Sequence, residues 1–182
     1  MSGFLRNIFN AYNKKNIPGG TISAVHTITS SINRVQNFIE FMQSHEDFVT
    51  KNYGMARGII TSQVALETGY GAKVIGKNLF NIKCTDYWKN KGGTCVGVMT
   101  KEEMKNGKLV PVYAYFRDYD TYRSSVIDYI NLIKNLTRYT YAWSNRTKPH
   151  EYFDGLVIGG YATDSSYARK LSDIYNTIKD CL

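Results

Sequence analysis

The chain of 182 residues is long enough for one folded domain, or for one domain with an appendage. Hydrophobic residues make up 43% of it and charged residues 21%, which are ordinary globular values and exclude a disordered chain. The formal net charge of +8 favours an anionic partner such as nucleic acid, acidic lipid or an anionic cell-wall polymer, and does not choose among them.

The first 30 residues have the pattern of a helical extension that precedes the main domain. The apolar residues Phe4, Leu5, Ile8, Phe9 and Tyr12 recur there at helical spacing. The basic residues lie off this apolar stripe. We favour a helix docked on the domain over one that lies on a membrane surface. Polar residues interrupt the stretch, so it lacks the apolar core of a secretory signal. Nowhere does a run of about 18 apolar residues predict a membrane span.

The next part of the chain is expected to form two helices. Apolar residues at helical spacing predict a first helix from about Thr29 to Tyr53, which Gly54 ends. A second helix is expected to begin at Met55 and to stop at the glycine-rich turn over 69–71.

Residues 94–117 have the pattern of a β-hairpin. They are rich in β-branched and aromatic residues, above all over 109–116 (LVPVYAYF). Between the two runs stands Asn106-Gly107, the strongest short hairpin signal in a sequence.

Helical spacing returns after residue 117. We expect a helix capped by Asp120, a loop over 138–148, a short helix over about 151–158, and a last helix capped near Asp164 or Ser165. Five or six helices with one small β-lobe make an α+β domain.

The cysteines are Cys84, Cys95 and Cys181, and they lack the spacing of a zinc site. We therefore expect no metal. Cys84 and Cys95 stand on either side of a polar loop and would staple it in an oxidising compartment. Two free thiols are an equally good interpretation of the sequence.

Glu67 is the residue whose position most clearly indicates chemistry. It follows Val64 by three on the apolar stripe of the second helix, so the periodicity directs its carboxyl inward. Burial makes a carboxyl hold its proton more tightly and raises its pKa, which suits a general acid near neutral pH. From the pattern alone, a glutamate that points to solvent is as good an interpretation.

Four stretches, in order along the chain, resemble the signature of glycoside hydrolase family 73, the bacterial glucosaminidases that cut peptidoglycan. They are residues 63–71 (QVALETGYG), 78–83 (NLFNIK), 103–108 (EMKNGK) and 160–171, which holds GYATD and then YARKL. The resemblance implies that residues 31–182 are a lysozyme-like catalytic domain, with a mostly helical body, a β-hairpin lobe beside the substrate groove, and no cofactor. The chain departs from the family at Asn81, where many relatives have glycine, and at Cys84 and Cys95, which are not typical of it.

The resemblance also assigns site residues. It implies that Glu67 is the general acid and that the second acidic residue is Glu103, with the adjacent Glu102 as the alternative. Neighbouring strand residues face opposite ways, so only one of these two can face the groove. The family's active-site tyrosine corresponds to Tyr161, with Tyr167 as a weaker candidate.

Four residues are candidates for binding the sugar: Tyr70, Asn78, Phe80 and Tyr167. Packing of the turn is at least as good an explanation for Tyr70, Asn78 and Phe80.

The implied substrate is a glycan of alternating N-acetylglucosamine and N-acetylmuramic acid, cut at the β-1,4 bond after N-acetylglucosamine. Glu103 would activate water and invert the anomeric carbon if it lies about 6.5–9.5 Å from Glu67. Otherwise the substrate's own acetamido group attacks, Tyr161 positions it, and the configuration is retained. The sequence does not decide between these routes.

The expected partners are glycan strands of the bacterial cell wall, with no nucleic acid and no stable membrane insertion. Without a leader pattern, the chain would reach the wall by phage lysis, by a secretion machine or as part of a larger phage, tail or secretion assembly. Three other functions remain open: a hydrolase with Cys84 as nucleophile, a nucleic-acid module, and a wall-binding module without activity.

Overall fold

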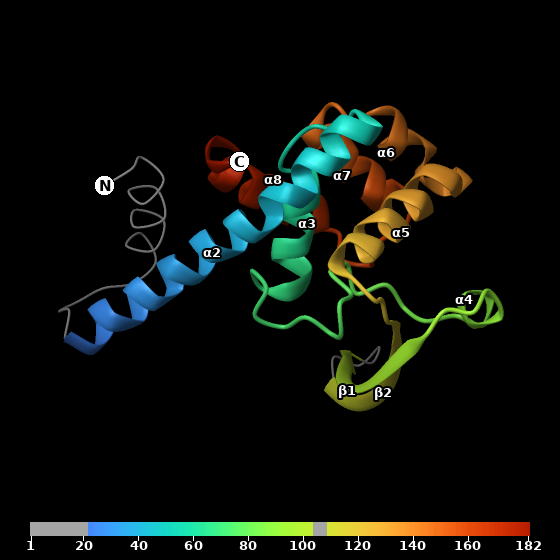
Figure 1. Ribbon diagram of the computed structural model, residues 1–182, viewed down its shortest axis with the longest axis horizontal. Helices are drawn as coiled ribbons and strands as arrows, with labels where there is room; N and C mark the ends of the chain where they lie inside the picture. Colours follow the sequence, from blue (N-terminus) through green and yellow to red (C-terminus); the bar gives the residue numbers. More distant parts are fainter. Residues whose placement is uncertain (1–21, 104–108) are drawn as a thin grey trace.

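The first described element is a long helix, and the rest of the described chain lies at the C-terminal half of this helix. In the computed structural model, the backbone is described over residues 22–103 and 109–182, and the side chains over 30–100 and 110–182. Helix α2 (Ile22–Tyr53) runs out to one side, and its later residues pack on the body (Figure 1). It begins earlier than expected and runs unbroken across residue 30, where the sequence predicted a domain boundary. The predicted apolar stripe over residues 4–12 lies outside the described residues.

Helix α3 (Ile59–Thr68) is the central helix of the body. All its residues from Ile59 to Ala65 are buried, as is typical of a helix enclosed on every side. It packs against α2 and α8 (Tyr167–Ile178). Three further helices are α5 (Tyr122–Asn135), α6 (Thr140–Ser144) and α7 (Pro149–Ile158). They pack in sequence on α8: α7 contacts α8, α6 contacts α7, and α5 contacts α6.

A buried carboxylate from another helix starts α3. The helix begins at Ile59 rather than at Met55, and Gly58 before it has φ 90 and no side chain that could cap. Glu46 of α2 supplies the acceptor instead, because its Oε1 accepts from Thr61 N at 2.9 Å and from Thr61 Oγ1 at 2.6 Å. First-turn N–H groups need such an acceptor. Glu46 thereby fixes the helix that has Glu67 at its other end.

The predicted β-hairpin is confirmed. Strands β1 (Cys95–Glu103) and β2 (Leu109–Arg117) are antiparallel, with Cys95 opposite Arg117 and Glu103 opposite Leu109. The hairpin extends away from the helical body (Figure 1). The Asn106-Gly107 turn lies outside the described residues.

Three contacts tie the base of the hairpin to the body. Lys83 forms a β-bridge with Phe116. Cys84 and Cys95 form a disulfide with Cα atoms 5.9 Å apart. Arg117 pairs with Asp128 of α5 at 2.7 Å. The disulfide settles the choice between a staple and two thiols, and Cys84 is therefore not a free nucleophile.

Several boundaries differ from the expected ones. Helices α4 (Asp86–Asn90) and α6 were expected as loops, and at five residues each they are too short to show a period. Thr121, rather than Asp120, caps α5 by accepting from Ser124 N at 3.0 Å. Asp164 accepts from Ser166 N at 2.8 Å in the turn before α8, which begins at Tyr167.

Seven α-helices and one two-stranded sheet make the described ranges an α+β domain, as predicted. None of the helices in these ranges is both long and apolar enough to cross a membrane.

Candidate active site

Glu67 lies in the last turn of α3, where the helix ends at Gly69 (φ 60). Its side chain is half-buried and held from two sides. Tyr167 Oη donates to Oε1 at 2.8 Å, and Asn81 Nδ2 approaches Oε2 at 3.4 Å. Burial raises the pKa of Glu67 above its usual 4.5, and the hydrogen bonds from Tyr167 and Asn81 oppose that rise. The carboxyl is therefore placed to keep its proton at a higher pH than a solvated glutamate would.

A cleft of about 630 Å³ runs past Glu67 between the helical body and the base of the hairpin, within the size range of small-molecule sites. Its lining residues come from the end of α3, the 80–85 segment, β2, the end of α5, the 3-10 turn that follows it (Thr137–Tyr139) and the turn before α8. They are Glu67, Phe80, Asn81, Ile82, Lys83, Thr85, Arg117, Leu132, Leu136, Arg138, Tyr139, Gly160, Tyr161, Ala162, Thr163 and Asp164.

Tyr161 lines the cleft, and Tyr167 stands beside it with the ring centroids 5.9 Å apart. Tyr161 Oη donates to the main-chain oxygen of Phe80 at 3.2 Å. Burial raises the pKa of both phenols above 10, and the neighbouring Glu67 raises it further. Both hydroxyls therefore stay protonated near neutral pH and act as hydrogen-bond donors.

The structure gives Asn78 a packing role, which the sequence analysis offered as the alternative to sugar contact. The residue is fully buried. Its Nδ2 donates to the main-chain oxygens of Ile82 and Arg117, at 2.9 Å each. Its Oδ1 accepts from the main-chain nitrogens of Phe80 and Ile82. Asn78 therefore joins the 78–82 loop to the end of β2.

Phe80 borders the cleft but belongs mainly to the core. Its side chain is 2% exposed, and its ring stacks on Tyr129 with centroids 4.0 Å apart. What it offers the site directly is the main-chain oxygen that Tyr161 binds.

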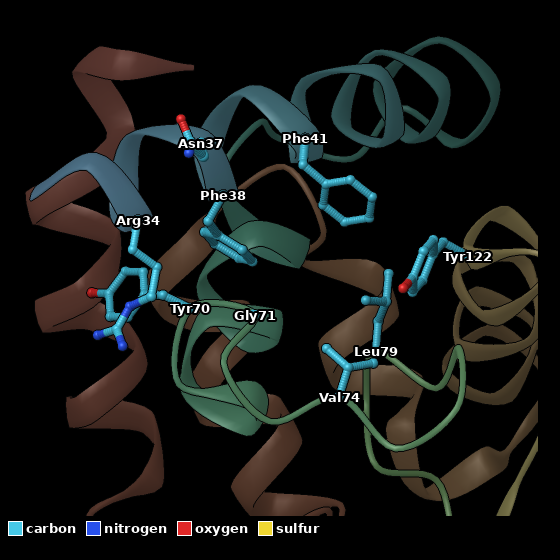
Figure 2. Close-up of a pocket in the computed structure, with 9 residues that line it drawn as sticks. All are labelled: Arg34, Asn37, Phe38, Phe41, Tyr70, Gly71, Val74, Leu79 and Tyr122. Carbon is cyan, nitrogen blue, oxygen red and sulfur yellow. The ribbon is translucent and has the colours of Figure 1, made fainter. Parts of the chain in front are cut away.

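Tyr70 lies apart from the Glu67 cleft. It lines a separate cavity of about 280 Å³ between α2, the turn after α3 and the start of α5, whose lining residues Figure 2 shows. There its ring meets the ring of Phe38 edge-on at 5.7 Å. Tyr70 is not among the residues that line the Glu67 cleft, and its contact with the sugar stays a prediction.

The two hairpin carboxylates stay a prediction. Glu103 ends β1 opposite Leu109, and Glu102 stands opposite Val110. They therefore occupy adjacent positions of one strand. The side chains of residues 101–109 lie outside the described ones.

The sequence analysis missed the role of Asn81. Its Nδ2 donates to the main-chain oxygen of Glu67 at 2.8 Å, and its backbone has φ 49. Glycine and asparagine are the residues that take this conformation most readily. The exchange of glycine for asparagine was visible in the sequence and signalled a left-handed backbone, but the bond to Glu67 was not visible. Elsewhere in the described ranges, no three His, Cys, Asp or Glu side chains gather to hold a metal ion.

Comparison with known proteins gives a consistent result. Residues 43–180 match the glucosaminidase family, described as mannosyl-glycoprotein endo-beta-N-acetylglucosaminidase. The chain is 30% identical over 172 residues to the peptidoglycan hydrolase FlgJ of Vibrio parahaemolyticus, covering 91% of this chain and 54% of FlgJ. It is 30% identical over 157 residues to the exo-glucosaminidase LytG of Bacillus subtilis, covering 80% of this chain and 52% of LytG. It thus spans about half the length of these relatives.

Solved structures agree with this match. A peptidoglycan hydrolase mutant from Sphingomonas sp. A1 superposes with a TM-score of 0.67 at 34% identity, over 78% of this chain and 92% of that one. The glycoside hydrolase domain of Salmonella typhimurium FlgJ, truncated at its C-terminus, gives 0.66 at 29% identity, over 81% and 99%. The lysozyme-like fold is therefore confirmed, and the chain belongs to the glucosaminidase family.

Proposed function

We propose that the protein is a peptidoglycan hydrolase that cleaves the β-1,4 bond between N-acetylglucosamine and N-acetylmuramic acid. One observation carries this proposal: a carboxyl with a raised pKa, Glu67, lies in a cleft large enough for sugar rings. Family membership and the names of the peptidoglycan hydrolases it resembles support the same substrate.

In this mechanism Glu67 is the general acid. Its raised pKa favours the protonated form, which donates its proton to the glycosidic oxygen as the bond breaks. The product of this step is a glutamate anion. Tyr167, which donates to Oε1 at 2.8 Å, stabilises that anion as it forms.

The cation-like sugar then needs a partner on its other face. Glu103 fills this role by activating water, or the substrate's acetamido group does so with Tyr161 as its positioning residue. Glu103 is the preferred candidate and the adjacent Glu102 is the alternative, because neighbouring positions of a strand face opposite ways.

Positive side chains favour an anionic glycan. Lys83 and Arg138 line the cleft, together with Arg117, which is paired with Asp128 at 2.7 Å. The cleft's Asp164 is paired with Lys170 at 2.6 Å. Peptidoglycan carries carboxylates on its muramic acid and stem peptides, so these side chains favour its approach. We place the action at the bacterial cell wall, with a larger phage, tail or secretion assembly as the proposed carrier.

The test is lysis of purified cell walls by Glu67→Gln, with Glu151→Gln of α7 as the matched control. We expect Glu67→Gln to lose about 10²-fold or more in rate and to keep its circular dichroism spectrum, because it lacks only the transferable proton. The control should lyse walls at the wild-type rate. Turnover near wild type in Glu67→Gln would overturn the assignment, and wild-type protein that binds walls without releasing fragments would be a binding module.

The products define the bond and the route. Mass spectrometry of digested walls should find N-acetylglucosamine at the reducing ends. Proton NMR of the first anomer released distinguishes inversion, which needs Glu103, from retention by the acetamido group. A large loss of activity in Glu103→Gln supports a direct role for that residue.

A further inference from the structure

A line of hydrogen-bonded side chains runs from the core to Glu67. Tyr152 Oη lies 2.7 Å from Tyr129 Oη, and Tyr129 Oη donates to Gln63 Oε1. Gln63 Nε2 in turn lies 3.4 Å from Tyr167 Oη, which donates to Glu67 Oε1 at 2.8 Å. The line joins α3, α5, α7 and α8.

The inner members of this line are buried, so they cannot form hydrogen bonds with solvent water instead. Gln63, Tyr129 and Tyr152 are each fully buried, and Tyr167 is 5% exposed. Burial raises the pKa of the three phenols above 10, so each keeps its one proton. Since a phenol has one proton to donate, the direction of each bond constrains the next.

The line therefore runs in one direction. Tyr129 uses its proton on Gln63 Oε1, so Tyr152 must donate to Tyr129. With Oε1 occupied, the amide of Gln63 presents its N–H to Tyr167. The Tyr167 oxygen accepts there, and its own proton points to Glu67. Bonds aligned in this way polarise one another.

We propose that Gln63, oriented by Tyr129 and Tyr152, is a positioning residue for the general acid. It keeps the Tyr167 hydroxyl donating its hydrogen bond to Glu67 Oε1, and the transferable proton of Glu67 is then placed on Oε2. This rests on the proposed role of Glu67 as general acid. Oε1 accepts the hydrogen bond from Tyr167, so it acts as the carbonyl oxygen of the protonated acid. Oε2 is then the oxygen that delivers its proton to the glycosidic oxygen.

Tyr129→Phe tests the proposal, because it removes a hydroxyl that touches neither Glu67 nor the cleft. Without that donor the side-chain amide of Gln63 can rotate by half a turn, so that its oxygen accepts from Tyr167. The Tyr167 hydroxyl then no longer donates to Glu67. Losing a donor to the carboxylate raises the pKa of Glu67, so the basic limb of the kcat/KM pH profile should move to higher pH. We expect kcat to fall about tenfold, as for loss of one hydrogen bond to a charged group, with KM unchanged.

Two variants bracket this measurement. Tyr167→Phe removes the bond directly and should give the larger shift of the same limb in the same direction. Tyr175→Phe removes a phenol outside the line and should leave the profile as in wild type. If Tyr129→Phe does not fold, Tyr152→Phe, one step further along, should give a smaller shift of the same sign.

The outcomes separate the two proposals. A basic limb that stays in place in both Tyr129→Phe and Tyr152→Phe, while Tyr167→Phe moves it, would overturn the role of Gln63 and leave the general acid intact. Full activity in Glu67→Gln would overturn both. A graded shift across Tyr152→Phe, Tyr129→Phe and Tyr167→Phe would support the line as drawn.

Discussion

Asn81 holds Glu67 at two points although the two residues belong to different segments. Its amide donates at 2.8 Å to the main-chain oxygen of Glu67 and at 3.4 Å to Oε2. The backbone of Asn81 has φ 49. One asparagine thus turns the chain where glycine would also fit and secures the acid at the end of α3.

Replacing Asn81 by glycine and by alanine separates these two roles. Both variants lose the amide that stabilises the Glu67 anion, so both should raise the pKa of Glu67 and move the basic limb of activity to higher pH. Alanine is strained at positive φ, so Asn81→Ala should unfold with about 1 kcal/mol less free energy than Asn81→Gly. Urea titration and the pH profile of wall lysis measure the two effects. Equal stabilities would contradict the backbone argument.

The long elements of this fold could be predicted because each has a period or a clear break. The end of α3 at Gly69 and both hairpin strands are examples. The start of α3 could not be predicted, because its cap is Glu46 from another helix. Helix α6 is also set by tertiary contact: a Cβ on Gly155 of α7 would lie 2.6 Å from the backbone of Ala142.

The site, like the fold, has features that the sequence predicts and features that depend on tertiary contacts. The inward direction of Glu67 follows from its place after Val64, and its half-burial and raised pKa agree with that reasoning. The partners of Glu67 could not be predicted, since Asn81 and Tyr167 reach it from other segments. The packing of Asn78 could not be predicted either. A family motif marks the residue, and its hydrogen bonds hold the loop to the end of β2.

Glu46 should make stability depend on pH. Burial raises its pKa above the usual 4.5, so between these two values the folded protein binds more protons than the unfolded one. The free energy of unfolding should therefore fall as pH rises through that window. Glu46→Gln should reduce this slope, and Glu40→Gln, an exposed change on the same helix, should not. Glu46→Leu removes the acceptor for Thr61 and should cost about 1–2 kcal/mol at the low end of this pH range. The cost should become smaller as pH rises, because leucine does not titrate. Denaturant titrations from pH 4 to pH 8 give all three results.

The disulfide should stabilise the anchorage of the hairpin. Cys84 and Cys95 are separated by 11 positions, and closing a loop of this length contributes about 3 kcal/mol by restricting the unfolded chain. The double variant Cys84→Ser/Cys95→Ser should lose about that much, and reductant should bring wild type to the same value. Cys181→Ser is the matched control, because that thiol is free. A double variant as stable as wild type would show that the bridge adds nothing to the fold.

Arg138 should contribute to substrate choice. It lines the Glu67 cleft, and no carboxylate in the described part of the chain forms an ion pair with it. An anionic glycan can therefore use its charge, whereas a neutral chitooligosaccharide cannot. Arg138→Gln should raise KM for peptidoglycan fragments up to about fivefold, as expected for an exposed ion pair, and leave kcat unchanged. Added salt should reduce the difference, because it screens exposed charges. Lys134→Gln makes the same change of charge on α5 outside the cleft lining and should leave KM as in wild type. An equal rise in KM for the neutral oligosaccharide would mean that Arg138 acts through shape rather than charge.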